Sequence, residues 1–333
     1  MLTKPPLLPM ITPRDHSAET RARLDVLTEE LSSGRVADAG RAVGSEFSTV
    51  SRVSHLLRTH DARAAALGQA STWLEVAQSA LAVVSEAGDR VSSELVSALT
   101  PGSRAQIDGI ARTALGALSD IASTLGQTMN GRAVFGNGDP SGEPLIDVDR
   151  MIAETSALAA TATDVASLTQ AFDAYFASGG GIDAGVLRSY PADPVRFPLG
   201  DGTAVEVPVS VGDASIRHAL RQAALVAALP DVGFPIDADV RGRLTSDLVG
   251  RAGTAAAGLV ATRADLGSTE ERVSALSDQL ADERMRLEAR RSDALAADPF
   301  ETATRLKDEM SRLETIYTVT ARRSRLRLTD FLR

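Results

Sequence analysis

The chain has 333 residues and a formal net charge of −9, with 44% hydrophobic but only 4% aromatic residues. An acidic chain has no general electrostatic attraction to nucleic acid or anionic lipid, so we expect neither as a partner. Cysteine is absent, which excludes disulfides, cysteine-ligated zinc and thiol catalysis. Ala, Leu and Val carry most of the apolar content, and they favour helix-on-helix packing over a sheet core.

The N-terminal leader is rich in proline. Pro5, Pro6 and Pro9 interrupt its short apolar run, so it lacks the apolar core of a secretory signal peptide. If the protein is exported, we expect it to leave without a cleaved signal peptide. Residues 1–14 are expected to be mobile, because their prolines disfavour a helix. No stretch approaches 18 consecutive apolar residues, so no membrane insertion is expected.

Two stretches without proline, 14–100 and 236–298, and the tail after Pro299 are where long helices can run. A proline in a helix interior would cost about 3 kcal/mol. Most of the aromatic residues fall between these stretches. The predicted fold class is therefore mainly α. We expect an elongated antiparallel helical bundle or coiled coil formed by the N- and C-terminal arms, with a small α+β central insert.

The N-terminal arm begins with a short helix. Its apolar stripe consists of Leu24, Leu27 and Leu31. The helix is predicted to end at Gly34, because glycine readily adopts the left-handed conformation that follows the last helical residue. A longer helix follows, in which residues spaced by three and four predict a coiled-coil seam. The predicted seam consists of Val50, Val53, Leu57, His60, Ala64, Leu67, Ser71, Leu74, Gln78 and Leu81.

The middle of the chain combines a helix start with strand signals. Ser103 and Gln106 have the spacing of a capping box, which predicts that a helix opens there. Two alternating runs near 195–209 flank a Gly-Asp-Gly turn and predict a β-hairpin. Pro198 and Pro208 would confine these strands to sheet edges.

The C-terminal arm carries apolar residues in heptad frames. The first frame contains Leu266, Val273, Leu276, Leu280 and Leu287, and the second contains Leu306, Met310, Leu313 and Tyr317. Asp298, Pro299 and Glu301 have the order of an N-cap, a first-turn proline and an acidic third residue, so the last helix is predicted to begin there.

These signals predict three parts. Residues 1–45 and 298–333 form terminal helices for polymer assembly, and residues 46–130 and 238–297 form the long-helix core. Residues 131–237 form a variable, outward-facing insert. The apolar stripes at the chain ends stabilise a monomer poorly and suit contacts between subunits. The predicted assembly residues are Leu24, Leu27, Leu31, Leu306, Met310, Leu313, Tyr317, Leu326, Leu328 and Phe331.

No pattern in the sequence indicates catalysis or a bound group. The four histidines lack metal-ligand spacing, and the glycine-rich loop at 136–142 lacks a P-loop ending. Carboxylates are interleaved with Arg along the helical stretches, which is typical of a solvated face. We therefore expect no enzyme activity, no catalytic, cofactor-binding or metal site, and no cofactor.

Four segments resemble the bacterial flagellin family. Residues 27–35 (LTEELSSGR) are similar to the end of the first helix of that family, and residues 305–317 and 324–332 are similar to its C-terminal helix. Residues 130–136 (NGRAVFG) resemble the point where the flagellin-like proteins of the hook–filament junction leave the helical core. The order of helices and insert also agrees along the chain.

This resemblance implies an exported structural component of the bacterial flagellum, assembled outside the cell at the hook–filament junction and supporting motility. It implies type III export. The implied partners are neighbouring copies, other hook-associated proteins, flagellin and an export chaperone. A filament flagellin remains an alternative. So does a protein of a different class, a helical adaptor or a secretion-system coiled-coil protein.

Overall fold

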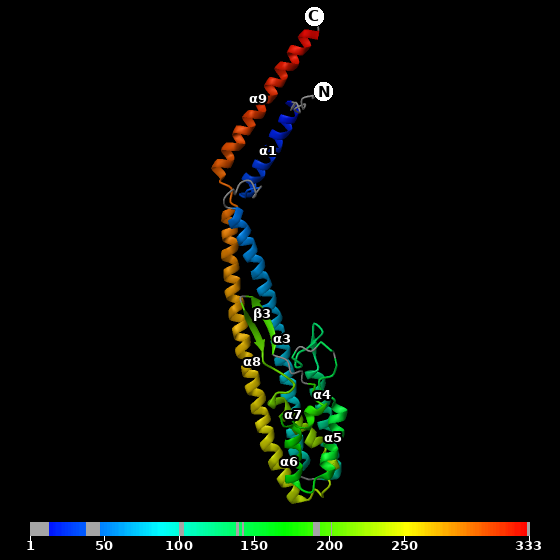
Figure 1. Cartoon of the computed structure of the whole chain (residues 1–333). Helices are drawn as coiled ribbons and strands as arrows, with labels where there is room; N and C mark the ends of the chain where they lie inside the picture. The colour runs from blue at the N-terminus through cyan, green and yellow to red at the C-terminus, as the bar shows by residue number, and fades with distance from the viewer. Residues whose placement is uncertain are drawn as a thin grey trace, which may run out of the picture. The chain divides into compact units, whose positions relative to one another are not determined.

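The computed structural model describes residues 13–37, 47–99, 103–137, 140–141, 143–188, 194–200 and 202–331. Helices dominate these residues (Figure 1), which confirms the mainly α fold class. The α-helices are α1 (Pro13–Ser33), α3 (Phe47–Leu99), α4 (Arg104–Leu125), α5 (Val148–Thr161), α6 (Val165–Phe176), α7 (Ala214–Ala227), α8 (Ala238–Ala294) and α9 (Pro299–Phe331). Two short 3-10 helices are η2 (Gly181–Ala184) and η3 (Leu229–Asp231). The strands are β1 (Thr128–Met129), β2 (Arg132–Ala133), β3 (Val195–Gly200) and β4 (Thr203–Val207).

The helix boundaries lie where the local sequence predicts them. α1 ends before Gly34, whose φ is +68° and whose N–H donates to the carbonyl of Glu30 at 2.9 Å. Ser103 and Gln106 form the reciprocal capping box that opens α4. α1 begins at Pro13, which suits proline because the first helical position needs no N–H donor. The leader was predicted to be mobile and non-helical over residues 1–14. Residues 1–12 lie outside the described residues, and for Pro13 and Arg14 the expected lack of a helix was wrong, because both belong to α1.

The chain folds into two compact units. The terminal unit comprises residues up to Asp61 and from Leu280 onward, and the central unit comprises residues from Ala62 to Gln279. The helices α3 and α8 contribute to both. The sequence predicted different boundaries, with the insert at 131–237 as a part of its own. Its helix α7 instead packs against α4 within the central unit, so the insert shares a core with the helices that precede it.

In the central unit, α3 and α8 run antiparallel. Gln78 of α3 donates from Nε2 to the carbonyl of Arg263 of α8 at 2.8 Å. The helices α4, α5 and α6 each pack against α7. Ser215 of α7 makes a hydroxyl–hydroxyl contact with Thr262 of α8 at 3.0 Å. These contacts build the core from several layers of helices, and its largest fully buried side chains include Phe135, Phe172, Leu67, Leu74, Leu81 and Leu118.

The predicted seam of α3 is confirmed in part. The buried positions beyond residue 64 follow the order Leu67, Ala70, Leu74, Ala77, Leu81 and Val84. Ala64 is exposed, so assigning it to the seam was wrong, whereas Ser71 and Gln78 are half-buried. Leu67, Leu74 and Leu81 keep the predicted seven-residue spacing. The buried residues between them are Ala70 and Ala77, one position before Ser71 and Gln78.

The predicted hairpin is present as β3 and β4. The strands are antiparallel, with Val195 opposite Val207 and Phe197 opposite Val205. Gly200 and Gly202 have φ values of +86° and +76°, which the turn requires and which glycine adopts without strain. The hairpin joins the core through Phe197, because its ring packs edge-on against Trp73 of α3 with centroids 5.8 Å apart.

Among the described residues, no helix combines the length and the apolar character needed to cross a bilayer.

A charge introduced into the core of the central unit should destabilise the protein. Leu67 is 1% exposed, so Leu67→Asp should destabilise the central unit by at least the roughly 2–5 kcal/mol typical of a buried Leu→Ala change. A thermal melt followed by circular dichroism measures the loss. Val83→Asp is the matched control, because Val83 lies on the same helix with an exposed side chain. Equal melting temperatures for the two variants would contradict the buried stripe.

A candidate subunit-assembly surface

The helices at the two ends of the chain, α1 and α9, pack against each other (Figure 1). Their polar contacts join distant parts of the sequence. Arg21 donates from Nε to the hydroxyl of Tyr317 at 3.0 Å, and its guanidinium carbon lies 5.6 Å from the centre of the tyrosine ring. Nη1 of Arg23 lies 3.4 Å from Oε1 of Glu309. These contacts are exposed and therefore contribute little stability by themselves.

A short backbone bridge holds the helix pair where α1 ends and α9 begins. Arg35 and Ala296 form an isolated antiparallel bridge. The N–H of Val36 donates to the carbonyl of Leu295 at 3.0 Å, and the N–H of Ala297 donates to the carbonyl of Gly34 at 2.9 Å. The C-terminal end of α1 therefore lies beside the N-terminal end of α9, and the two helices run antiparallel.

The predicted assembly residues gather on this helix pair, and their side chains are incompletely covered. Leu24, Leu27, Leu306 and Leu313 are half-buried. Leu31 and Tyr317 are exposed, and Met310 is 54% exposed. Leu326, Leu328 and Phe331 lie on α9, but their side chains are outside the described residues. The structure thus brings the two predicted stripes onto one pair of helices.

The same pair exposes apolar side chains that the heptad frames missed. Phe300 is 84% exposed and Val319 58% exposed on α9, and Val26 of α1 is also exposed. None of them falls in the frame of Leu24, Leu27 and Leu31 or in that of Leu306, Met310, Leu313 and Tyr317. A search for large apolar residues anywhere on these polar helices would have found them. Large exposed apolar side chains gathered on one element indicate an interaction surface.

The start of α9 is set by one side chain. The carboxylate of Asp298 accepts from the N–H of Phe300 at 2.8 Å and from that of Glu301 at 3.1 Å. An aspartate at this position also complements the positive end of the helix dipole. The cap places the exposed Phe300 in the first turn of α9, next to the bridge that holds both helices.

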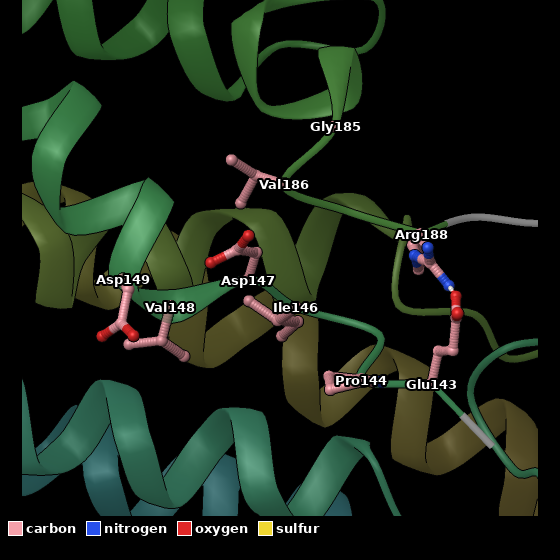
Figure 2. A pocket seen from close by; sticks show the side chains of 9 residues that line it. All are labelled: Glu143, Pro144, Ile146, Asp147, Val148, Asp149, Gly185, Val186 and Arg188. Carbon is pink, nitrogen blue, oxygen red and sulfur yellow. Dashed lines mark ion pairs between the residues drawn. The ribbon is translucent and has the colours of Figure 1, made fainter.

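The central unit contains an open pocket, which is an alternative candidate site (Figure 2). It encloses about 580 Å³ and is lined by Glu143, Pro144, Ile146, Asp147, Val148, Asp149, Gly185, Val186 and Arg188. Two of its acidic groups have partners or structural roles. Glu143 pairs with Arg188, and Asp147 accepts from the N–H of Arg150 at 3.0 Å as the N-cap of α5. Within the described ranges, no group of three or more His, Asp or Glu side chains is arranged to hold a metal ion.

Comparisons with known proteins point to the C-terminal helices. Residues 249–332 match the model of the bacterial flagellin C-terminal helical region. The C-terminal part of the chain is therefore flagellin-like. The matched residues cover much of α8 and all of α9, so they include the predicted assembly residues Leu306, Met310, Leu313 and Tyr317. No curated protein matches the chain.

The fold of this flagellin-like chain is also found in a solved structure. The crystal structure of Bacillus cereus FlgL is similar to it with a TM-score of 0.52 and 13% sequence identity. The similarity covers 72% of this chain and 98% of the FlgL chain. At this level of identity the likeness establishes a shared fold, which agrees with the predicted order of helices and insert.

Removing the N-cap of α9 should destabilise the start of that helix. Asp298→Ala should destabilise the first turn of α9 by about 1 kcal/mol, because two N–H groups lose their acceptor. Hydrogen exchange of the amides of Phe300 and Glu301 should become several-fold faster. Asp308→Ala removes a carboxylate from the middle of the same helix and is the control. Unchanged exchange at Phe300 in the Asp298→Ala variant would show that the cap does not determine where α9 begins.

Proposed function

We propose that this protein is a structural component of the bacterial flagellum, assembled outside the cell at the hook–filament junction, where it supports motility. One observation carries the proposal. The flagellin C-terminal match includes all of α9, a helix that exposes the apolar side chains of Phe300, Met310 and Val319.

The α1–α9 pair supplies the proposed assembly surface. Two helices can bury only the stripes that face each other, so the remaining apolar side chains need another partner. Covering an exposed apolar surface with a neighbouring subunit contributes about 25 cal/mol per Å². Met310 and Tyr317 of α9 and Leu31 of α1 are exposed, and they would lie against neighbouring copies. Leu326, Leu328 and Phe331 would extend this surface along α9.

The other partners follow from the proposed position. At a junction, the protein contacts neighbouring copies, other hook-associated proteins and flagellin. We further propose that an export chaperone covers the apolar surface of α1 and α9 before assembly, and that residues 131–237 face outward. Export would proceed without a cleaved signal peptide. The protein would have no enzyme activity.

We favour the junction over the filament because of the shared fold. The similarity extends over 98% of the chain of FlgL, a hook–filament junction protein. The proline and hairpin signals of the insert and the segment at residues 130–136 favour the same assignment. A filament flagellin is the competing assignment, and it predicts a different location for the protein.

Localisation distinguishes these assignments. Gold-labelled antibodies applied to purified hook–basal bodies with attached filaments should mark one narrow band between hook and filament. Label along the whole filament would identify a filament flagellin instead. Absence of label from both structures would leave a helical adaptor or a secretion-system protein and would overturn the proposed function.

The assembly surface can be tested with one exposed residue. Met310→Asp should leave the thermal melt unchanged, because Met310 is 54% exposed in the chain. It should abolish assembly and swimming, because the interface would then bury an unpaired charge. Export into the medium should persist and can be measured by immunoblot.

Thr315→Asp is the matched control for this test. It introduces the same charge on α9 at an exposed position that lies outside the frame of Leu306, Met310, Leu313 and Tyr317. This variant should swim. Normal swimming by Met310→Asp would show that this stripe of α9 is not an assembly surface.

A further inference from the structure

Two buried arginines lie one turn apart on α7 and differ in how their nitrogens are bonded. Arg217 is 7% exposed and Arg221 is 4% exposed. Each side-chain nitrogen of Arg217 has an acceptor. Nε donates to the carbonyl of Gly212 at 2.7 Å, Nη1 to that of Ala177 at 3.3 Å, and Nη2 to Oδ1 of Asp183 at 2.6 Å. Arg217 therefore shows what complete bonding of a buried guanidinium looks like in this protein.

Arg221 is bonded incompletely. Its Nε lies 2.7 Å from Oδ1 of Asp173, and its Nη2 donates to the carbonyl of Thr169 over a long 3.4 Å. Its Nη1 has no acceptor among the described residues. Burial lowers the pKa of Arg221, the charge of Asp173 opposes this effect, and the charge of Arg251 adds to it. A buried charged donor without an acceptor is destabilising.

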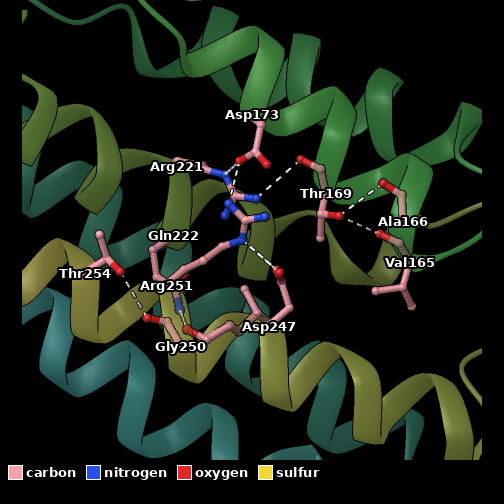
Figure 3. A network of polar contacts seen from close by, with 11 residues as sticks. Val165, Ala166, Thr169, Asp173, Arg221, Gln222, Asp247, Gly250, Arg251 and Thr254 are labelled. Carbon is pink, nitrogen blue, oxygen red and sulfur yellow. Dashed lines mark hydrogen bonds and ion pairs between the residues drawn. The ribbon is translucent and has the colours of Figure 1, made fainter.

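Arg221 shares its carboxylate partner with a second arginine. Asp173 contacts both Arg221 and Arg251 (Figure 3), and its Oδ1 accepts from Nη1 of Arg251 at 2.8 Å. Asp247 binds Nε of Arg251 at 2.8 Å. The carboxylate oxygen nearest Arg221 is therefore shared between two guanidinium groups.

A cavity of about 120 Å³ adjoins this network. It is lined by Asp173, His218, Arg221, Arg251 and Thr254. Its volume is well above the roughly 10–15 Å³ that a single water molecule needs. The lining offers two guanidinium groups, an imidazole and a hydroxyl, and the carboxylates beside the two guanidinium groups are Asp173 and Asp247. Hydrogen-bond donors therefore predominate in the lining, which favours a ligand that accepts several hydrogen bonds.

We propose that the cavity binds a small oxyanion, a carboxylate or a phosphate group, which accepts a hydrogen bond from Nη1 of Arg221. Nη1 is fully buried, so the Arg221 side chain would turn toward the cavity when the ligand binds. Arg251, His218 and Thr254 complete the site. The bound anion links α7 and α8 and stabilises the central unit. This site is independent of the assembly surface on α1 and α9.

Isothermal titration calorimetry on the full chain tests the site. Inorganic phosphate and acetate are titrated separately, with chloride at the same ionic strength as the reference. We expect one saturable site per chain for at least one oxyanion, and a rise in melting temperature that saturates over the same concentration range. Preference for phosphate or for acetate identifies which group the site takes. Heats and melting temperatures that do not exceed those with chloride would overturn the proposal.

Single substitutions test whether the anion binds in this cavity. Arg221→Gln should lower the affinity at least tenfold, whereas Arg217→Gln removes an equally buried arginine of the same helix and should retain the affinity. Because Arg221→Gln also breaks an ion pair with Asp173, a second variant leaves both cavity arginines in place. Thr254 is exposed at the edge of the cavity, so Thr254→Leu should fill the space and abolish binding without loss of the fold. Wild-type affinity in both Arg221→Gln and Thr254→Leu would exclude this cavity as the site.

Discussion

An isolated pair of helices can bury only the stripes that face each other, and this limit governs both units of the chain. In the central unit, α3 and α8 are covered further by α7 and by the β3–β4 hairpin, so that Trp73 and Leu248 are almost completely buried. In the terminal unit, α1 and α9 pair with each other, and no further layer covers them among the described residues. Exposed apolar side chains such as Met310 and Val319 are the direct consequence.

Features that depend on a few neighbouring residues could be predicted from the sequence. The end of α1 at Gly34, the capping box of Ser103 and the cap of Asp298 were all predicted, because each is a contact between residues at most four positions apart. The hairpin was predicted for the same reason, since its turn requires glycines with positive φ. Local chemistry determines such features almost alone.

Features that depend on packing between distant segments could not be predicted. The heptad frame placed Ala64 in the seam of α3, although Ala64 is exposed and the buried alanines of this stretch are Ala70 and Ala77. The sharing of a core between α4 and α7 left no local signal either. Likewise, Arg217 and Arg221 look alike in the sequence, and each has an aspartate partner. Arg217 is fully bonded because the carbonyls of Gly212 and Ala177 lie beside its other nitrogens, whereas Nη1 of Arg221 has no such acceptor among the described residues. The exposed Phe300 was missed because it lies outside any heptad frame.

The helices α1 and α9 are joined by weak polar contacts and expose apolar side chains. Both properties are unfavourable for a monomer and would suit a subunit of a polymer. The polar contacts of α1 and α9, including those of Arg21 with Tyr317 and of Arg23 with Glu309, are exposed and individually weak. The apolar side chains beside them remain partly in water. A helix pair held this loosely can be opened or rearranged at low free-energy cost, whereas the core around Leu67 and Leu74 cannot. Neighbouring subunits that cover the apolar side chains would then order α1 and α9, so that the energy of assembly is concentrated at the ends of the chain while the central unit keeps its structure throughout.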